Sequence, residues 1–180
     1  LNMRMGLGSA LANAGACLAA LALLLTGHSS IHPLRWLLAP LLAVHLLVVG
    51  FWFGALAPLY WSVTRESPSV AARLMARFSA LAGWLVPCIL VAGLAVAYVL
   101  SPDLVMLEHT YGKLVLVKLA AFVLLMALAS YNKWWLTPAM ESGKSGAARS
   151  LRQTISLEFL LIVGVLAVTA VLTTYYSPES

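Results

Sequence analysis

The sequence predicts an all-α protein, a polytopic bundle of five transmembrane helices that forms a single domain over residues 1–180. Two observations predict this fold class. Hydrophobic residues make up 62% of the 180 positions and charged residues only 9%, whereas soluble globular domains carry about 25% charged residues. The hydrophobic residues also lie in long runs, and a run of about 20 apolar residues can cross a bilayer as a helix.

Short segments rich in glycine, proline and serine separate the hydrophobic runs, as expected of loops between helices. These breaks fall at residues 27–33, 67–68, 101–102 and 137–138, the last followed by the polar stretch 141–150. We therefore predict spans at residues 6–26, 36–61, 74–100, 111–135 and 155–175.

The spans differ in the residues that govern their packing. The first has a small side chain at every fourth position, at Gly8, Ala12, Ala16 and Ala20. Such a stripe lets another helix approach closely and permits a homo-oligomer. The second and third spans contain Pro40, Pro58 and Pro87, and a proline inside a helix removes a backbone hydrogen bond. The apolar settings of Cys17 and Cys88 predict buried thiols rather than a disulfide.

The distribution of basic residues predicts the orientation of the spans. Cytoplasmic loops carry an excess of lysine and arginine. Eight of the eleven basic residues fall on one side of the predicted topology: Arg4, Arg65, Arg73, Arg77, Lys133, Lys144, Arg149 and Arg152. Tyrosines and tryptophans gather at both ends of the spans, where interfacial aromatic belts are expected. The N-terminus is therefore predicted to be cytoplasmic and the C-terminus to lie on the outer side.

All four histidines fall toward the predicted outer side. His28 and His32 share one outer loop and His109 lies in the other, beside Met106 and Glu108. A four-residue spacing places two imidazoles on one face of a helix, and a mixture of imidazole and thioether ligands suits copper. These loops predict a metal site, and two polar loops that merely contain histidine are the alternative.

His45, Lys118 and Glu158 are ionisable residues within the predicted spans. Such residues tend to face a bundle interior or a wet pathway. His45 is the best candidate for a ligand or proton relay, and a neutral imidazole bonded to a freed backbone carbonyl is an equal alternative. Lys118 is expected to extend toward the interface. Glu158 is expected to pair with Arg152 or Lys133 at the inner end of its span.

Several motifs that would indicate other functions are missing from the sequence. It has no glycine-rich phosphate loop, no nucleophile elbow and no HExxH motif, so we expect no enzymatic activity. The net charge of +5 is spread singly between hydrophobic runs rather than gathered in a patch. We therefore expect no nucleic-acid partner.

Short motifs along most of the chain resemble the copper resistance protein D family. They are Gly27-His28, Val44-His45-Leu46-Leu47, Phe51-Trp52-Phe53-Gly54, Arg77-Phe78-Ser79, Gly93, Tyr111-Gly112-Lys113 with Lys118, Asn132 with Pro138, and Leu151-Arg152 with Glu158. The resemblance implies a multi-pass protein of the bacterial inner membrane that moves copper from periplasm toward cytoplasm, often beside a small periplasmic copper-binding partner. Family members are usually longer, so this chain, which starts at Leu1, is expected to be the C-terminal membrane part.

These observations lead to one main hypothesis and two alternatives. In the main hypothesis, copper is captured on the outer side by His28, His32, Met106 and His109, with help from Glu108 or Asp103. The ion then passes to His45 within the membrane. Lys118 and Glu158 lie along the pathway. The first alternative is a b-type cytochrome subunit, since haem needs axial ligands on facing helices and His45 and His109 could supply them. The second is a structural or assembly subunit without transport of its own.

Overall fold

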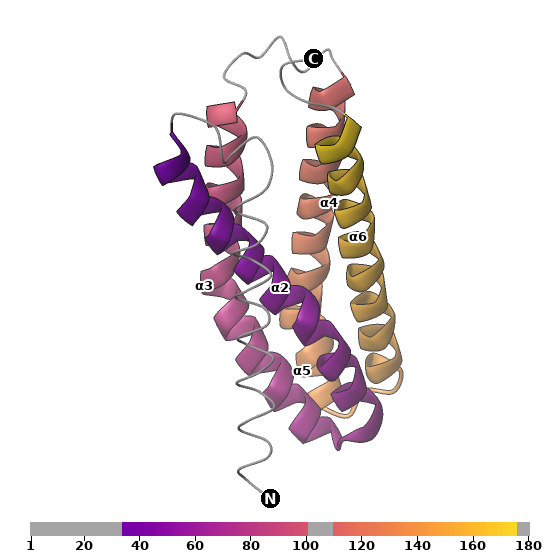
Figure 1. Ribbon diagram of the computed structural model, residues 1–180. Helices are drawn as coiled ribbons and strands as arrows, with labels where there is room; N and C mark the ends of the chain where they lie inside the picture. Colours follow the sequence, from indigo (N-terminus) through magenta and orange to yellow (C-terminus); the bar gives the residue numbers. More distant parts are fainter. Residues whose placement is uncertain (1–33, 101–109, 176–180) are drawn as a thin grey trace, which may run out of the picture. The chain divides into compact units, whose positions relative to one another are not determined.

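A computed structural model describes residues 34–100 and 110–175, and these residues form helices joined by short turns (Figure 1). The helices are α2 (Arg35–Arg65), α3 (Pro68–Leu100), α4 (Thr110–Tyr131), the π-helix η3 (Asn132–Leu136), α5 (Thr137–Glu141) and α6 (Ala147–Tyr175). No strand occurs in the described ranges. The predicted first span, 6–26, lies outside the described residues, as do His28, His32, Met106, Glu108 and His109.

Four helical stretches of the described chain are long and apolar enough to cross a membrane: Trp36–Arg65, Pro68–Ala95, Gly112–Glu141 and Ala147–Val171. Large apolar side chains on these helices point outward, including Val91, Val123 and Leu160, each more than 60% exposed. A surface of this kind is suited to lipid rather than to water. The all-helical, membrane-spanning fold is thus confirmed for four helices, while the fifth span and the orientation of the termini stay predictions.

The helices extend further than the hydrophobic runs predicted. Helix α2 continues to Arg65 instead of ending near residue 61, and α3 begins at Pro68 instead of residue 74. Ser67 precedes the proline, and its carbonyl oxygen accepts hydrogen bonds from the amides of Val70 and Ala71. Serine before a helix and proline at its first position are favoured there. The helices extend beyond the predicted spans because hydrophobicity stops at the membrane surface, whereas helical hydrogen bonding continues to the next capping signal.

Half of the polar stretch 141–150 is helical, so the helices extend into it from both sides. Helix α6 begins at Ala147 rather than at residue 155, so the turn between α5 and α6 is short. Gly143 and Gly146 adopt φ values of 73° and 84°, a left-handed conformation that glycine tolerates and that commonly ends helices. These two glycines reverse the chain direction between α5 and α6.

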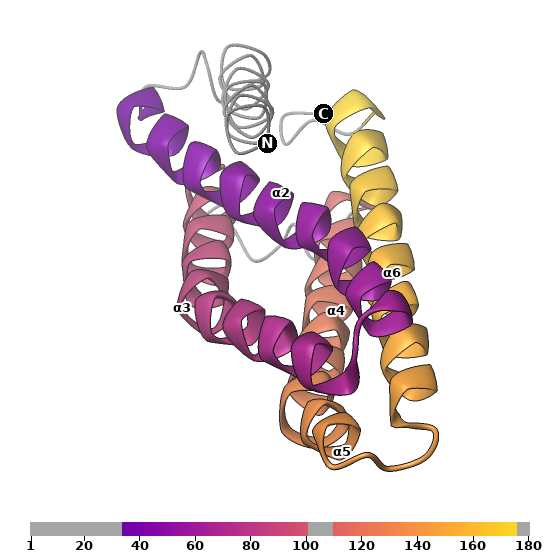
Figure 2. The same ribbon diagram turned by 90° about the horizontal axis from the view of Figure 1, so that it is seen from below.

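The described chain divides into two compact units, and α2 and α3 contribute to both. The larger unit contains residues 52–84 and 110–175; within it α4 and α6 run side by side (Figures 1 and 2). Its buried apolar side chains include Leu56, Leu59, Met75, Leu136, Leu151 and Ile155. The smaller unit contains residues 34–51 and 85–100, with Leu38, Val48, Ile89 and Ala92 buried.

Candidate functional site

The larger unit contains a π-helical turn at the end of α4. The amide of Thr137 bonds to the carbonyl oxygen of Asn132, five residues earlier, and the Thr137 hydroxyl donates to the same oxygen at 2.8 Å. Pro138 follows, and a proline lacks an amide hydrogen and crowds the carbonyl four residues before it. The wider turn accommodates this proline within a continuous helical segment. Such single π turns occur frequently at functional sites.

The π turn holds Asn132 against Glu158 of α6. The Asn132 Nδ2 atom donates a hydrogen bond of 2.7 Å to the Glu158 carboxylate oxygen Oε1. On the other side of the amide, the Thr154 hydroxyl donates to Asn132 Oδ1, which fixes the direction of the carboxamide. Asn132 and Glu158 are each only 3% exposed. An amide and a carboxyl group are therefore enclosed together in a membrane-spanning part of the chain.

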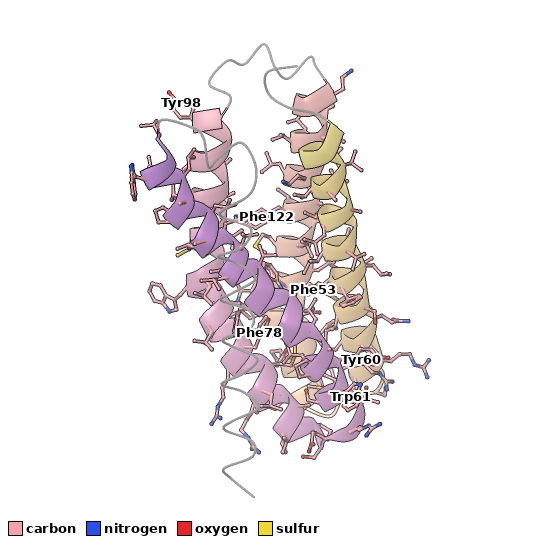
Figure 3. All side chains as sticks on the ribbon, in the orientation of Figure 1. Phe53, Tyr60, Trp61, Phe78, Tyr98 and Phe122 are labelled. Carbon is pink, nitrogen blue, oxygen red and sulfur yellow. The ribbon has the colours of Figure 1, made fainter. Side chains whose placement is uncertain are left out.

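Helix α2 supplies the aromatic side of this polar cluster, which we define as Trp52, Asn132, Thr154 and Glu158. The Trp52 indole is directed at the Glu158 carboxyl group, but its buried Nε1 has no acceptor in good hydrogen-bonding geometry among the described residues. The next residue, Phe53 (Figure 3), stacks on Phe159 with ring centroids 4.9 Å apart. Three elements thus converge on one carboxyl group.

Glu158 does not have the partner that the sequence suggested. Its hydrogen bond comes from the neutral Asn132 amide, rather than from Arg152 or Lys133. The Lys133 ammonium group instead lies near Gly83 of α3, with Nζ 3.8 Å from the position a Cβ atom would take there. The role of Glu158 in a transport pathway stays a prediction.

In the smaller unit, His45 of α2 contacts the backbone of α3. Its Nδ1 lies 3.2 Å from the carbonyl oxygen of Ile89. A carbonyl oxygen only accepts, so Nδ1 carries the proton and the lone pair of the neutral ring is on Nε2. Histidines that ligate metals commonly donate their second N–H to a carbonyl in this way. His45 is thus bonded to a backbone carbonyl, and its roles as a metal ligand or as a neutral structural imidazole stay predictions.

Gly93 makes this approach possible. A Cβ atom at Gly93 would lie 3.3 Å from His45 Cε1 and 3.4 Å from Nδ1, closer than most side-chain contacts. The acceptor is the carbonyl of Ile89 and not one freed by Pro87, which would be the carbonyl of Gly83, four residues before the proline. Sequence reasoning singled out His45 and Gly93 separately and missed that they meet.

The remaining predicted residues divide as follows. Of the six predicted metal ligands, only His45 lies in the described ranges, and those ranges contain no group of three or more His, Cys, Asp or Glu side chains placed to hold a metal. The expectation that Cys88 is buried was wrong, since its side chain is exposed on α3. Lys118 is half-buried on α4 and lines a pocket facing α6.

Comparison with known proteins gives a consistent family. The family model described as Copper resistance protein D matches residues 72–172. The chain is 35% identical over 149 residues to Copper resistance protein D of Pseudomonas syringae pv. tomato, covering 76% of this chain and 48% of that protein. It is 26% identical over 135 residues to Inner membrane protein YebZ of Escherichia coli (strain K12), covering 73% and 47%. The chain thus spans about half the length of these relatives. No solved structure matches it.

Proposed function

We propose, because this chain belongs to the copper resistance protein D family, that it moves copper ions across the bacterial inner membrane from periplasm toward cytoplasm. The chain is a multi-pass inner-membrane protein, as its four apolar helices and its relative YebZ indicate. The proposed role is transport rather than catalysis. The observation that carries the proposal is the His45–Ile89 hydrogen bond, which orients an imidazole inside a membrane-spanning helix.

We assign the capture of copper to the outer loops. His28, His32, Met106 and His109 combine imidazole and thioether groups, a ligand set that suits copper in either oxidation state. Glu108 or Asp103 adds negative charge beside them. This arrangement also fits delivery by a small periplasmic copper-binding protein.

We assign His45 to the next step, in which the ion leaves the outer loops and enters the helices. The tautomer set by the Ile89 carbonyl leaves the lone pair on Nε2, the form in which imidazole binds a metal ion. Fixing the ring in advance lowers the entropy lost when a ligand binds. Gly93 supports this step because it allows the ring to lie against the α3 backbone.

Glu158 has an electrostatic part in this proposal rather than that of a direct ligand. Carboxylates within transmembrane helices commonly mark ion pathways. A carboxylate oxygen is a hard ligand, however, and Cu(I) favours soft sulfur. We therefore place Glu158 and its Asn132 partner as a polar group that compensates the charge of a passing cation.

The orientation with a cytoplasmic N-terminus belongs to the same proposal. In the larger unit, Arg65 ends α2, and Lys144 and Arg149 flank the start of α6. Exposed aromatic rings lie at this end of α2, at Tyr60 and Trp61 (Figure 3), with the Arg65 guanidinium 4.6 Å from the centre of the Trp61 ring. Basic and aromatic residues together are typical of the cytoplasmic interface.

Copper accumulation in cells that express the protein tests the proposal. We expect His45→Ala to reduce accumulation, and Gly50→Ala, a change on the same helix with open space around it, to leave it unchanged. Membrane expression of both variants is measured by immunoblot. Unchanged accumulation in His45→Ala at normal expression would contradict the role of His45, and increased accumulation would contradict the inward direction.

A second measurement separates transport from the haem alternative. We expect the purified protein to be colourless and to contain copper by elemental analysis after loading. A Soret band in the absorption spectrum would instead identify a cytochrome and overturn the proposal.

A further inference from the structure

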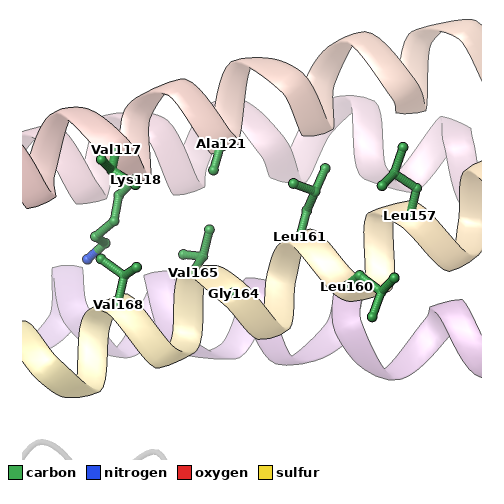
Figure 4. A pocket seen from close by; sticks show the side chains of 9 residues that line it. All are labelled: Val117, Lys118, Ala121, Leu157, Leu160, Leu161, Gly164, Val165 and Val168. Atoms are coloured by element: carbon green, nitrogen blue, oxygen red, sulfur yellow. The ribbon is translucent and has the colours of Figure 1, made fainter.

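The larger unit contains an apolar groove between α4 and α6 (Figure 4). Its volume is about 320 Å³, at the lower end of the range typical of ligand pockets. Helix α4 contributes Val117, Lys118 and Ala121, and α6 contributes the stretch from Leu157 to Val168. Apart from Lys118, every lining residue is aliphatic or glycine.

Small residues create the groove. Gly164 lines it on α6 and Ala121 on α4. A Cβ atom built on Gly164 would have no other atom within 4 Å. The absence of a side chain at this position therefore leaves space rather than bringing two backbones together.

The groove is polar at one end and apolar at the other. Lys118 extends toward Val168 at one end, and Leu157 lies at the opposite end (Figure 4). Leu157 and Val168 lie about 16 Å apart along the helix axis, at about 1.5 Å per residue. A positive charge followed by an apolar trench of this length is complementary to an amphiphile with an anionic head and a hydrocarbon tail.

The lining of the groove offers Lys118 no acidic partner. The nearest acidic residue along α6, Glu158, follows Leu157 at the far end and accepts the hydrogen bond from Asn132. An ammonium group in a membrane-spanning helix is unfavourable unless it reaches the interface or meets a negative charge. Lys118 lies eight residues into α4, about 12 Å along its axis, so its side chain can reach a headgroup from the nearer leaflet.

We propose that this groove binds one acyl chain of an anionic phospholipid, with the headgroup held by Lys118. The acyl chain fills the trench between Ala121 and Gly164, and the ammonium group of Lys118 pairs with the negative headgroup. A basic residue near a membrane surface favours anionic lipid by about 1 kcal/mol, which corresponds to about a fivefold preference. Lipid binding at this site requires no copper, so it can be tested apart from transport.

Native mass spectrometry of the purified chain tests the proposal, with phosphatidylglycerol and phosphatidylcholine of the same acyl chains as probes. We expect the unchanged protein to retain phosphatidylglycerol about fivefold better. Lys118→Met should abolish this preference, while Lys113→Met, the matched change at an exposed lysine of the same helix, should preserve it. Gly164→Leu should fill the groove and reduce the retention of both lipids.

Three results would overturn the proposal. Equal retention of the two lipids by the unchanged protein would show that the groove does not recognise the headgroup charge. The same loss of preference in Lys113→Met would show a general surface charge effect. Full lipid retention in Gly164→Leu would show that something else occupies the groove, such as another segment of the protein or a second copy. Circular dichroism and the intermediate variant Gly164→Ala distinguish a filled groove from a misfolded protein.

Discussion

The hydrogen bond between Asn132 and Glu158 gives a quantitative prediction for stability. Asn132→Ala removes the Nδ2 donor that lies 2.7 Å from the Glu158 carboxylate and leaves a buried carboxyl group without that bond. Hydrogen bonds to charged groups contribute about 1.5–3 kcal/mol, whereas those between membrane helices average about 0.6 kcal/mol and reach about 1.7. Because this bond is short and buried, its energy should lie near the upper value measured between membrane helices. We therefore expect a coupling energy of about 1.5 kcal/mol between Asn132 and Glu158.

Little of this effect should come from Thr154. Its hydroxyl loses the Asn132 acceptor in Asn132→Ala but keeps the carbonyl oxygens of Ser150 and Leu151, at 3.1 Å and 2.9 Å. A hydroxyl that keeps two acceptors is not left unsatisfied. The coupling therefore reports mainly on the bond to Glu158.

A double-mutant cycle measures the coupling directly. The unchanged protein, Asn132→Ala, Glu158→Ala and the double variant are unfolded with dodecyl sulfate in mixed micelles and followed by circular dichroism. Side-chain truncation terms cancel in the cycle, and the interaction energy remains. The exposed Glu66→Ala combined with Asn132→Ala is the control, which should be additive. Additivity within about 0.3 kcal/mol for the Asn132–Glu158 pair would refute the reasoning.

Two further predictions concern the packing of His45 and the π turn. Gly93→Ala should displace the imidazole from the Ile89 carbonyl and destabilise the protein by about 1 kcal/mol. Gly50→Ala, with open space around it, should instead stabilise it by up to about 1 kcal/mol. Thermal unfolding in detergent compares the two variants, and equal shifts in unfolding temperature would argue against the contact. Thr137→Val removes a buried hydroxyl bond to Asn132 and should cost about 1 kcal/mol, while Thr64→Val, whose bond to Tyr60 is exposed, should be nearly neutral by the same measurement. Similar losses at both threonines would mean that burial at the π turn adds nothing.

The membrane-spanning helices could be predicted because the bilayer imposes a simple rule. A spanning segment must be apolar over about 20 residues, and this requirement is visible in composition alone. The ends of the helices could not be read in the same way. Helix α6 begins at Ala147 because a pair of glycines with positive φ ends the turn before it. That boundary lies outside the hydrocarbon region, where hydropathy carries no signal.

The partner of Glu158 shows why the candidate site was harder to predict. Arg152 lies six residues before Glu158, and at about 100° per residue this places the two side chains about 120° apart around the helix. Thr154, four residues before Glu158, shares its face and does belong to the polar cluster. Asn132 is 26 residues away in the sequence, and its contact depends on packing between helices. The same holds for His45, whose contacts with Ile89 and Gly93 depend on the packing of α2 against α3.

The π turn connects these features of the larger unit. It adds one residue to a turn relative to an α-helix, and removing that residue would rotate everything before it by about 100° relative to α5. Asn132 would then leave the face that meets α6, and Glu158 would lose the amide that bonds it. Keeping a π turn is unfavourable for an isolated helix, because its hydrogen-bond geometry departs from the usual one. Pro138 reduces this penalty, since the α-helical alternative would crowd the carbonyl four residues earlier. Pro138 disfavours the regular α-helix at this point. The hydrogen bond to Glu158 stabilises the position that Asn132 takes in the π turn. Both residues therefore favour the same backbone geometry.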